Sequence, residues 1–201
     1  MTFRRAALAL LTIVLVSCSP AAPEPSWADQ IVSARREKDR LFREGNDSPL
    51  PPERRASFAG LSYFAIDESY RVPASFAAAP ADARTIVKMP TSTGQMRDMV
   101  RVGQLTFTLK GQTLHLSAFM EADEPQVDRL FVPFSDLTTG RETYAGGRYL
   151  DLNRTPSGFY DLDFNRAYHP YCLYNPTYDC PIPPRENRLS LPVRAGERLS
   201  E

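Results

Sequence analysis

The chain has 201 residues, with 24 lysine and arginine side chains and 24 aspartate and glutamate side chains. This balance of charge gives no basic surface of the kind that nucleic-acid-binding proteins use, so no nucleic-acid partner is expected. The length fits a single domain with one core, and no apolar run is long enough to cross a bilayer as a helix.

The first residues resemble an export signal. Residues 4–5 are arginines and residues 6–16 are mostly apolar, a run too short to span a membrane but typical of a signal peptide. Residues 15–18 (Leu-Val-Ser-Cys) then resemble the lipobox of bacterial lipoproteins, which implies cleavage before Cys18 and a diacylglycerol on its sulfur. The alternative is an ordinary secretory signal with an incidental cysteine.

These features divide the chain into three parts. We expect a signal peptide at 1–17, a lipidated cysteine with a flexible tether at 18–26, and a single domain at 27–201. The tether consists of small residues, proline and one glutamate, which bury nothing. The protein is therefore expected outside the cytoplasm, anchored to a bacterial membrane through lipidated Cys18, because two acyl chains hold a protein firmly at a bilayer surface.

An amphipathic helix of about 18 residues is predicted at the start of the domain. Ser26, with Asp29 three residues later, resembles a helix N-cap, and Gly45 followed by Asn46 supplies the stop. Between these ends the apolar residues recur at helical spacing. They are Trp27, Ile31, Ala34, Leu41 and Phe42.

The rest of the chain alternates between apolar and polar residues. A proline-rich loop is expected at 46–54, and strands are expected after it. The expected strands cover 85–89, 97–102, 105–109, 113–118, 130–134, 148–152 and 159–164, with Lys110-Gly111 as the tight turn of a hairpin. Short strands at this spacing predict a mainly β fold, an antiparallel sandwich or barrel-like domain with one N-terminal amphipathic helix.

Two arginines and a glutamate surround a glycine pair in the segment 136–152. Arg141, Glu142 and Arg148 could form an anion or sugar pocket, because arginine matches carboxylates in a bidentate geometry and Gly146-Gly147 lets a ligand approach the backbone. The alternative is a β-hairpin in which the glycines make the turn or bulge, and Arg148 and Glu142 form a structural ion pair.

A second polar cluster consists of Asp161, Asp163 and Asn165, which alternate along a strand-like segment and so share one face. Such oxygen ligands could hold Ca²⁺, or two carboxylates could act as acid and base on a sugar. The segment lacks the glycine and glutamate of an EF-hand loop. A polar sheet face, with Asn165 capping the next turn, is the simpler interpretation, and we expect no metal and no cofactor.

The segment 163–184 holds four tyrosines, two cysteines and five prolines within 22 residues. Proline removes a backbone donor and fixes its own φ, so this segment should be irregular in structure yet defined in shape. Its tyrosines could stack on sugar rings or pack on the prolines. These are Tyr168, Tyr171, Tyr174 and Tyr178. His169 is expected to be a hydrogen-bonded structural residue, and His115 to be exposed to solvent.

Cys172 and Cys180 are the only thiols that remain if Cys18 is acylated. An oxidising extracytoplasmic space favours a disulfide between them, which would close the tyrosine-rich loop. The alternative is a metal pair, for which the chain offers only His115 and His169 as histidine partners.

Several segments together carry a family resemblance that spans nearly all of residues 27–197. They are 58–67, 89–94, 130–136, 142–144, 147–151, 163–165, 170–172, 180–187 and 195–197. Through them the chain resembles the bacterial and archaeal family called domain of unknown function 1684. The resemblance implies the domain limits and no activity, because the family has none assigned. The family pattern usually has asparagine in place of His169, which argues against a catalytic histidine.

The sequence thus favours a lipid-anchored protein that acts at the cell envelope as a binding or structural module, with an envelope glycan or another small ligand as its candidate partner. The alternative is a hydrolase that acts on an envelope glycan through Asp161 or Asp163 with Glu142. We favour the interpretation without catalysis. The candidate ligand-binding residues are Arg141, Glu142, Arg148, Asp163, Asn165 and Tyr171.

Overall fold

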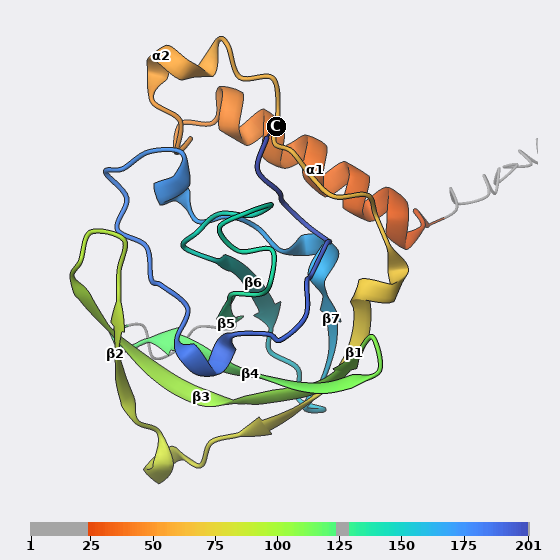
Figure 1. Ribbon diagram of the computed structural model, residues 1–201, viewed down its shortest axis with the longest axis vertical. Helices are drawn as coiled ribbons and strands as arrows, with labels where there is room; N and C mark the ends of the chain where they lie inside the picture. The colour runs from red at the N-terminus through yellow and green to blue at the C-terminus, as the bar shows by residue number, and fades with distance from the viewer. Residues whose placement is uncertain (1–23, 124–128, 201) are drawn as a thin grey trace, which may run out of the picture.

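The computed structural model describes residues 24–123 and 129–200 of the chain (Figure 1). The expected signal peptide, Cys18 and most of the expected tether lie outside these residues. Within the described part, no helix is both long enough and apolar enough to cross a membrane.

The N-terminal helix α1 spans Trp27–Glu44, as predicted. The Ser26 side chain accepts a hydrogen bond from the backbone N–H of Asp29, and the N–H of Gly45 closes the last turn on the carbonyl of Leu41. Ile31 and Phe42 are buried, because they face the rest of the domain. The proline-rich stretch after α1 was expected to be a loop, but it contains a single helical turn, α2 (Pro52–Arg55), started by proline at its first position.

Seven strands of the described residues form one antiparallel sheet. They are β1 (Arg71–Ala78), β2 (Ile86–Pro90), β3 (Met96–Leu109), β4 (Gln112–Glu121), β5 (Arg129–Phe134), β6 (Arg148–Asn153) and β7 (Phe159–Asp163). The order across the sheet is β6-β5-β4-β3-β1-β7, and β2 pairs with one end of β3. The sheet curls until it is nearly closed, which confirms the barrel-like prediction (Figure 1).

Two details of the sheet differ from the expectation. The separate strands expected at 97–102 and 105–109 are one strand, β3, in which the register against β4 shifts at Gly103. This residue lies so close to the ring of Phe76 that a side chain would not fit. The strand β1 was not expected, although it pairs on both sides, with β3 and with β7.

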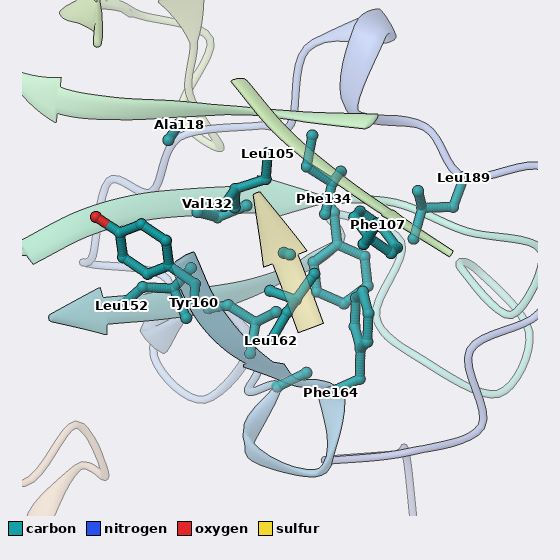
Figure 2. Packing of buried hydrophobic residues seen from close by; sticks show 14 of the residues in the cluster. Leu105, Phe107, Ala118, Val132, Phe134, Leu152, Tyr160, Leu162, Phe164 and Leu189 are labelled. Carbon is teal, nitrogen blue, oxygen red and sulfur yellow. The ribbon is translucent and has the colours of Figure 1, made fainter. Parts of the chain in front are cut away.

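The core fills the inside of the curled sheet (Figure 2). Each fully buried aliphatic or aromatic side chain there contributes about 1.5–3 kcal/mol to folding. Among its members are Leu105, Phe107, Val132, Phe134, Leu162 and Phe164. The chain after β7 returns across the open side of this core, where Leu189, Val193 and Ala195 are buried with it. The C-terminal segment is therefore part of the core, and it carries polar groups into a buried region.

Candidate functional site

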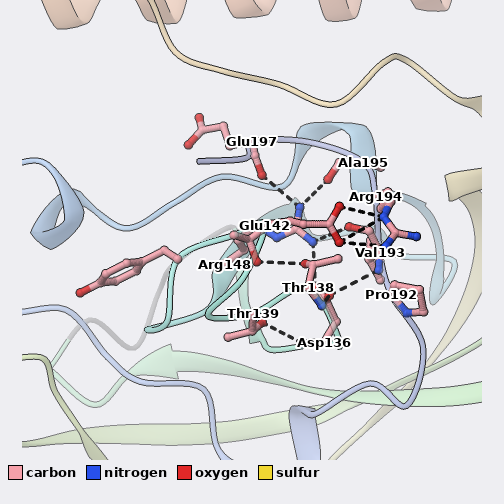
Figure 3. A network of polar contacts seen from close by, with 12 residues as sticks. Asp136, Thr138, Thr139, Glu142, Arg148, Pro192, Val193, Arg194, Ala195 and Glu197 are labelled. Atoms are coloured by element: carbon pink, nitrogen blue, oxygen red, sulfur yellow. Dashed lines mark hydrogen bonds and ion pairs between the residues drawn. The ribbon is translucent and has the colours of Figure 1, made fainter. Parts of the chain in front are cut away.

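Arg148, the first residue of β6, is fully buried and holds the C-terminal segment against the sheet (Figure 3). Its Nη2 lies 2.8 Å from Oδ2 of Asp136 and 2.7 Å from the carbonyl of Val193. Its Nη1 donates to the carbonyls of Ala195 and Glu197. The expected pair of Arg148 with Glu142 was wrong, because Asp136 provides the counter-charge.

Glu142 lies on the surface, where it forms a bidentate pair with Arg194, with contacts of 2.8 and 2.9 Å. This pair lowers the pKa of the Glu142 carboxyl below its usual value, chiefly through hydrogen bonds from the arginine. Arg141 is exposed beside it. The three residues that the sequence placed in one pocket thus have different environments, one buried and two at the surface. Gly147, at φ 82°, makes the turn into β6, as the hairpin interpretation expected.

Asp163 and Asn165, at the end of β7, form hydrogen bonds to other segments. Asp163 bonds to the helix α1, and Asn165 bonds to the segment around Asp67. Oδ2 of Asp163 accepts a hydrogen bond of 2.8 Å from Nε1 of Trp27, and its Oδ1 accepts from the backbone N–H of Asn165. Asp163 therefore caps the turn, whereas Asn165 was expected to do so. The side chain of Asn165 instead bonds both backbone groups of Asp67, at 2.9 and 3.0 Å. Asp161 pairs with Arg71 at 2.6 Å.

Cys172 and Cys180 are free thiols, so the predicted disulfide was wrong. The backbone N–H of Cys172 lies 3.3 Å from Sγ of Cys180, while the Cys172 thiol points to the hydroxyl of Tyr144 at 3.8 Å. The two side chains thus lie close together without a bond between their sulfur atoms. Burial raises the pKa of the Cys180 thiol to about 12, which keeps it protonated. Among the described residues, no cluster of three or more histidine, cysteine, aspartate or glutamate side chains could hold a metal ion.

A buried polar network surrounds Glu197, which sequence reasoning did not single out. Its Oε1 lies 2.6 Å from Nζ of Lys38, and its Oε2 accepts hydrogen bonds from the His169 backbone N–H at 2.7 Å and the Tyr174 hydroxyl at 3.1 Å. Nε2 of His169 accepts from the backbone N–H of Tyr144. Burial, followed by the nearby cations Arg148 and Lys38, lowers the pKa of His169 to about 3. The imidazole is therefore neutral and structural, as expected.

Of the four tyrosines in the 163–184 segment, Tyr171 is exposed and the other three are partly buried. Tyr174 packs edge-on against Phe42, with ring centroids 5.0 Å apart, and has a structural role. Tyr168 adds its backbone to the edge of β6 through two hydrogen bonds with Tyr149. Tyr171 remains 40% exposed and meets Tyr178 edge-on at 5.3 Å between centroids.

Tyr171 and Tyr178 line a groove of about 460 Å³ formed by α1, the strands β5 and β6 and the 163–184 segment. We call it the tyrosine groove. Among the residues that line it are Leu41, Phe131, Asp151, Tyr168, Tyr171 and Tyr178. Asp151 accepts a hydrogen bond of 2.8 Å from the hydroxyl of Tyr168. Of the ligand candidates from the sequence, Tyr171 is the one that lines this groove. Leu41, Phe131 and Asp151 could not be found from sequence, because they come from three separate elements.

Comparisons with known proteins agree with the family resemblance. The sequence model of a family described as "Protein of unknown function (DUF1684)" matches residues 56–198. The chain is similar to the solution NMR structure of an uncharacterized protein from Haloarcula marismortui, with 42% identity and a TM-score of 0.67, over 86% of this chain and 94% of that one. No curated protein matches the sequence.

Proposed function

The chain belongs to DUF1684, a family of proteins of unknown function, and within that family we propose that it is a carbohydrate-binding module held at the cell envelope by a lipid. The observation that carries the proposal is the tyrosine groove, in which the exposed ring of Tyr171 and the partly buried ring of Tyr178 lie beside Leu41, itself 46% exposed. Aromatic rings offer flat apolar faces that suit the C–H faces of sugar rings.

Polar groups at the edge of the groove favour a sugar as its ligand, in preference to a purely apolar molecule. Asp151 is exposed and can accept hydrogen bonds from sugar hydroxyls, which gives orientation to a ring that stacks on Tyr171. Lys38 also lines the groove, but its charge is matched by Glu197 at 2.6 Å. The groove therefore offers one carboxylate and no uncompensated cation, which favours a neutral sugar unit.

The membrane anchor rests on the sequence alone. Residues 15–18 fit a lipobox, and a short stretch rich in small residues and proline separates Cys18 from the start of α1 at Trp27. Such a tether would hold the domain close to the bilayer outside the cytoplasm, where envelope glycans lie within reach. Anchoring and binding then form one function, the attachment of an envelope glycan to a membrane surface.

The hydrolase alternative gains no support from the arrangement of its residues. Asp161 is paired with Arg71, Glu142 is paired with Arg194, and Asp163 holds the indole of α1. A glycosidase needs two carboxyl groups that face one scissile bond. Each of these three carboxylates instead has its own structural partner.

The proposal is tested by titrating the full-length protein, in detergent, with soluble fragments of bacterial envelope glycans in a calorimeter. We expect Tyr171→Ala to weaken binding roughly three- to tenfold, which corresponds to the loss of one aromatic contact. Phe159→Ala is the matched control, because Phe159 is also an exposed aromatic residue, at 69%, but lies on β7 and does not line the groove. Equal affinity in the wild type and the Tyr171 variant would exclude the groove as the glycan site.

A further inference from the structure

A second pocket, of about 180 Å³, lies on the inner side of α1, apart from the aromatic rings of Tyr171 and Tyr178. It is bounded by α1, by the chain that follows β7 and by the C-terminal segment. Among the residues that line it are Arg35, Lys38, Tyr63, Arg166 and Glu197. Three of these side chains are cations and one is an anion, so the lining carries a surplus of positive charge.

Two of the cations in this pocket have counter-ions. Lys38 pairs with Glu197 at 2.6 Å, and the Glu197 carboxylate is almost completely buried. Arg166, at the exposed mouth of the pocket, lies 3.5 Å from Asp163. Both carboxylates, Asp163 and Glu197, also accept hydrogen bonds from other groups. Neither therefore forms an ion pair with Arg35 as well.

Arg35 has no such partner. Its Nη1 and Nη2 donate to the backbone carbonyls of Phe64 and Asn165, at 3.1 and 3.5 Å, and it forms no ion pair with any residue that the structure describes. The guanidinium is partly buried, and this desolvation lowers the pKa of Arg35 below its usual value. A partly buried cation without a counter-ion is unfavourable unless an anion reaches it.

Two hydrogen-bond donors in the same pocket are also without an acceptor. Nε of Arg35 and the hydroxyl of Tyr63 are both buried, and neither has a hydrogen-bond partner within the described part of the chain. The two side chains are in contact, since the guanidinium carbon of Arg35 lies 4.3 Å from the centroid of the Tyr63 ring, and both line this pocket. Burial raises the pKa of the Tyr63 hydroxyl above its usual value, so it keeps its proton and remains a donor.

We propose that this pocket binds an oxyanion, the carboxylate or phosphate group of a small ligand, through Arg35 and Tyr63. An oxyanion supplies what both groups lack, because its oxygens accept hydrogen bonds and its charge balances the guanidinium. A water molecule could satisfy the two donors but would not offset the desolvation of the guanidinium, which outweighs the attraction that Asp163 and Glu197 exert on it. Arg166 at the mouth adds a second cation to attract the ligand. The pocket shares Lys38 and Tyr168 with the tyrosine groove, but the proposal rests on neither of these two residues.

The test uses full-length protein in a zwitterionic detergent, labelled with ¹⁵N-arginine, so that the Nε–H signals can be followed by NMR. Sodium acetate and inorganic phosphate are titrated separately, each against sodium chloride at the same ionic strength. We expect a saturable shift of the Arg35 Nε–H signal with one or both oxyanions. Acetate alone would indicate a carboxylate site, and phosphate alone a phosphate site. Arg36, the next residue of α1, is exposed and should not respond.

Two variants and one control complete the experiment. Tyr63→Phe removes only the hydroxyl and should weaken binding roughly tenfold, as expected for one hydrogen bond to a charged group. Arg35→Lys should weaken it at least as much, while Arg36→Lys should leave it unchanged. Shifts that grow without saturation and are equal at Arg35 and Arg36 would overturn the proposal. So would an affinity that Tyr63→Phe does not change.

Discussion

Arg148 and Asp136 form an ion pair of 2.8 Å in which the two side chains are 1% and 0% exposed. Its Nη1 and Nη2 also donate to three backbone carbonyls of the C-terminal segment, among them that of Val193, whereas the buried Nε has no hydrogen-bond partner among the described residues. One side chain therefore joins β6, the loop after β5 and the end of the chain. Because the arginine is surrounded by protein on all sides, a ligand cannot reach it in this structure.

Replacing Arg148 should affect stability before it affects any binding. We expect Arg148→Ala to lower the free energy of unfolding by about 3–5 kcal/mol, because Asp136 is then left buried without a counter-charge. Urea unfolding followed by circular dichroism measures this loss. The control is Arg194→Ala, which breaks the exposed pair with Glu142 and should change stability by less than about 1 kcal/mol. Similar small losses in both variants would mean that Arg148 is not the anchor we describe.

The requirement for glycine at position 147, just before β6, can also be tested by unfolding measurements. Gly147 and Gly140 have nearly equal φ angles, 82° and 78°, but different surroundings. A Cβ at Gly147 would meet Pro183 and the carbonyl of Phe134, whereas a Cβ at Gly140 would meet nothing.

We therefore expect Gly140→Ala to destabilise by about 1 kcal/mol, the approximate cost of a positive φ in a residue other than glycine. Gly147→Ala should lower the free energy of unfolding by about 1–3 kcal/mol more than Gly140→Ala does, because the added Cβ overlaps its neighbours. Unfolding midpoints of the two variants decide the question. If the two variants lose equal stability, the positive φ alone explains the glycine at position 147, and the close packing against Pro183 and Phe134 does not contribute.

His169 should make stability depend on pH. Its pKa is lowered to about 3 in the folded state, whereas an unfolded histidine titrates near about 6.5. As the pH falls below about 6.5, the unfolded chain binds a proton that the folded chain does not, so stability decreases. Each such proton lowers the unfolding free energy by at most about 1.4 kcal/mol per pH unit.

The measurement is a series of melting curves between about pH 7 and 5, above the range in which most carboxylates titrate. The melting temperature of the wild type should fall across this window, and His169→Asn should remove much of the fall. His115→Asn is the control, because His115 is exposed, and it should keep the wild-type slope. Parallel curves for the wild type and His169→Asn would contradict a neutral, buried His169.

The helix α1 could be predicted because its signals are local. Ser26 and Gly45 mark its ends, and the spacing of Ile31 and Phe42 marks its buried face. The strand β1 could not be predicted, because Pro73 and several alanines are residues of low β propensity. Its extended shape is imposed by neighbours on both sides, where Ala74 faces Phe107 of β3 and Tyr160 of β7. Pro73 is tolerated because pairing with β3 begins only at Ala74.

The candidate site was harder to predict than the fold, because its contacts join distant segments. A structural ion pair at Arg148 was one of two interpretations of its motif, but the spacing could not distinguish Asp136 from Glu142 as its partner. The predicted disulfide failed for a related reason. Redox conditions and cysteine count say nothing about where Cys172 and Cys180 point, and here one thiol faces Tyr144. Leu41 and Asp151 enter the tyrosine groove only through the tertiary fold.

The proposed lipid anchor at Cys18 can be tested directly. Cys18→Ala should move the protein from the membrane fraction to the soluble extracytoplasmic fraction, because each buried methylene of the acyl chains contributes about 0.8 kcal/mol to membrane binding. The variant should also fail to incorporate a tagged fatty acid supplied to the cells. Cys172→Ala is the matched control, since it removes a cysteine of the domain and should stay lipidated and membrane-bound. If Cys18→Ala remains with the membrane, another part of the chain provides the attachment, and the lipobox interpretation fails.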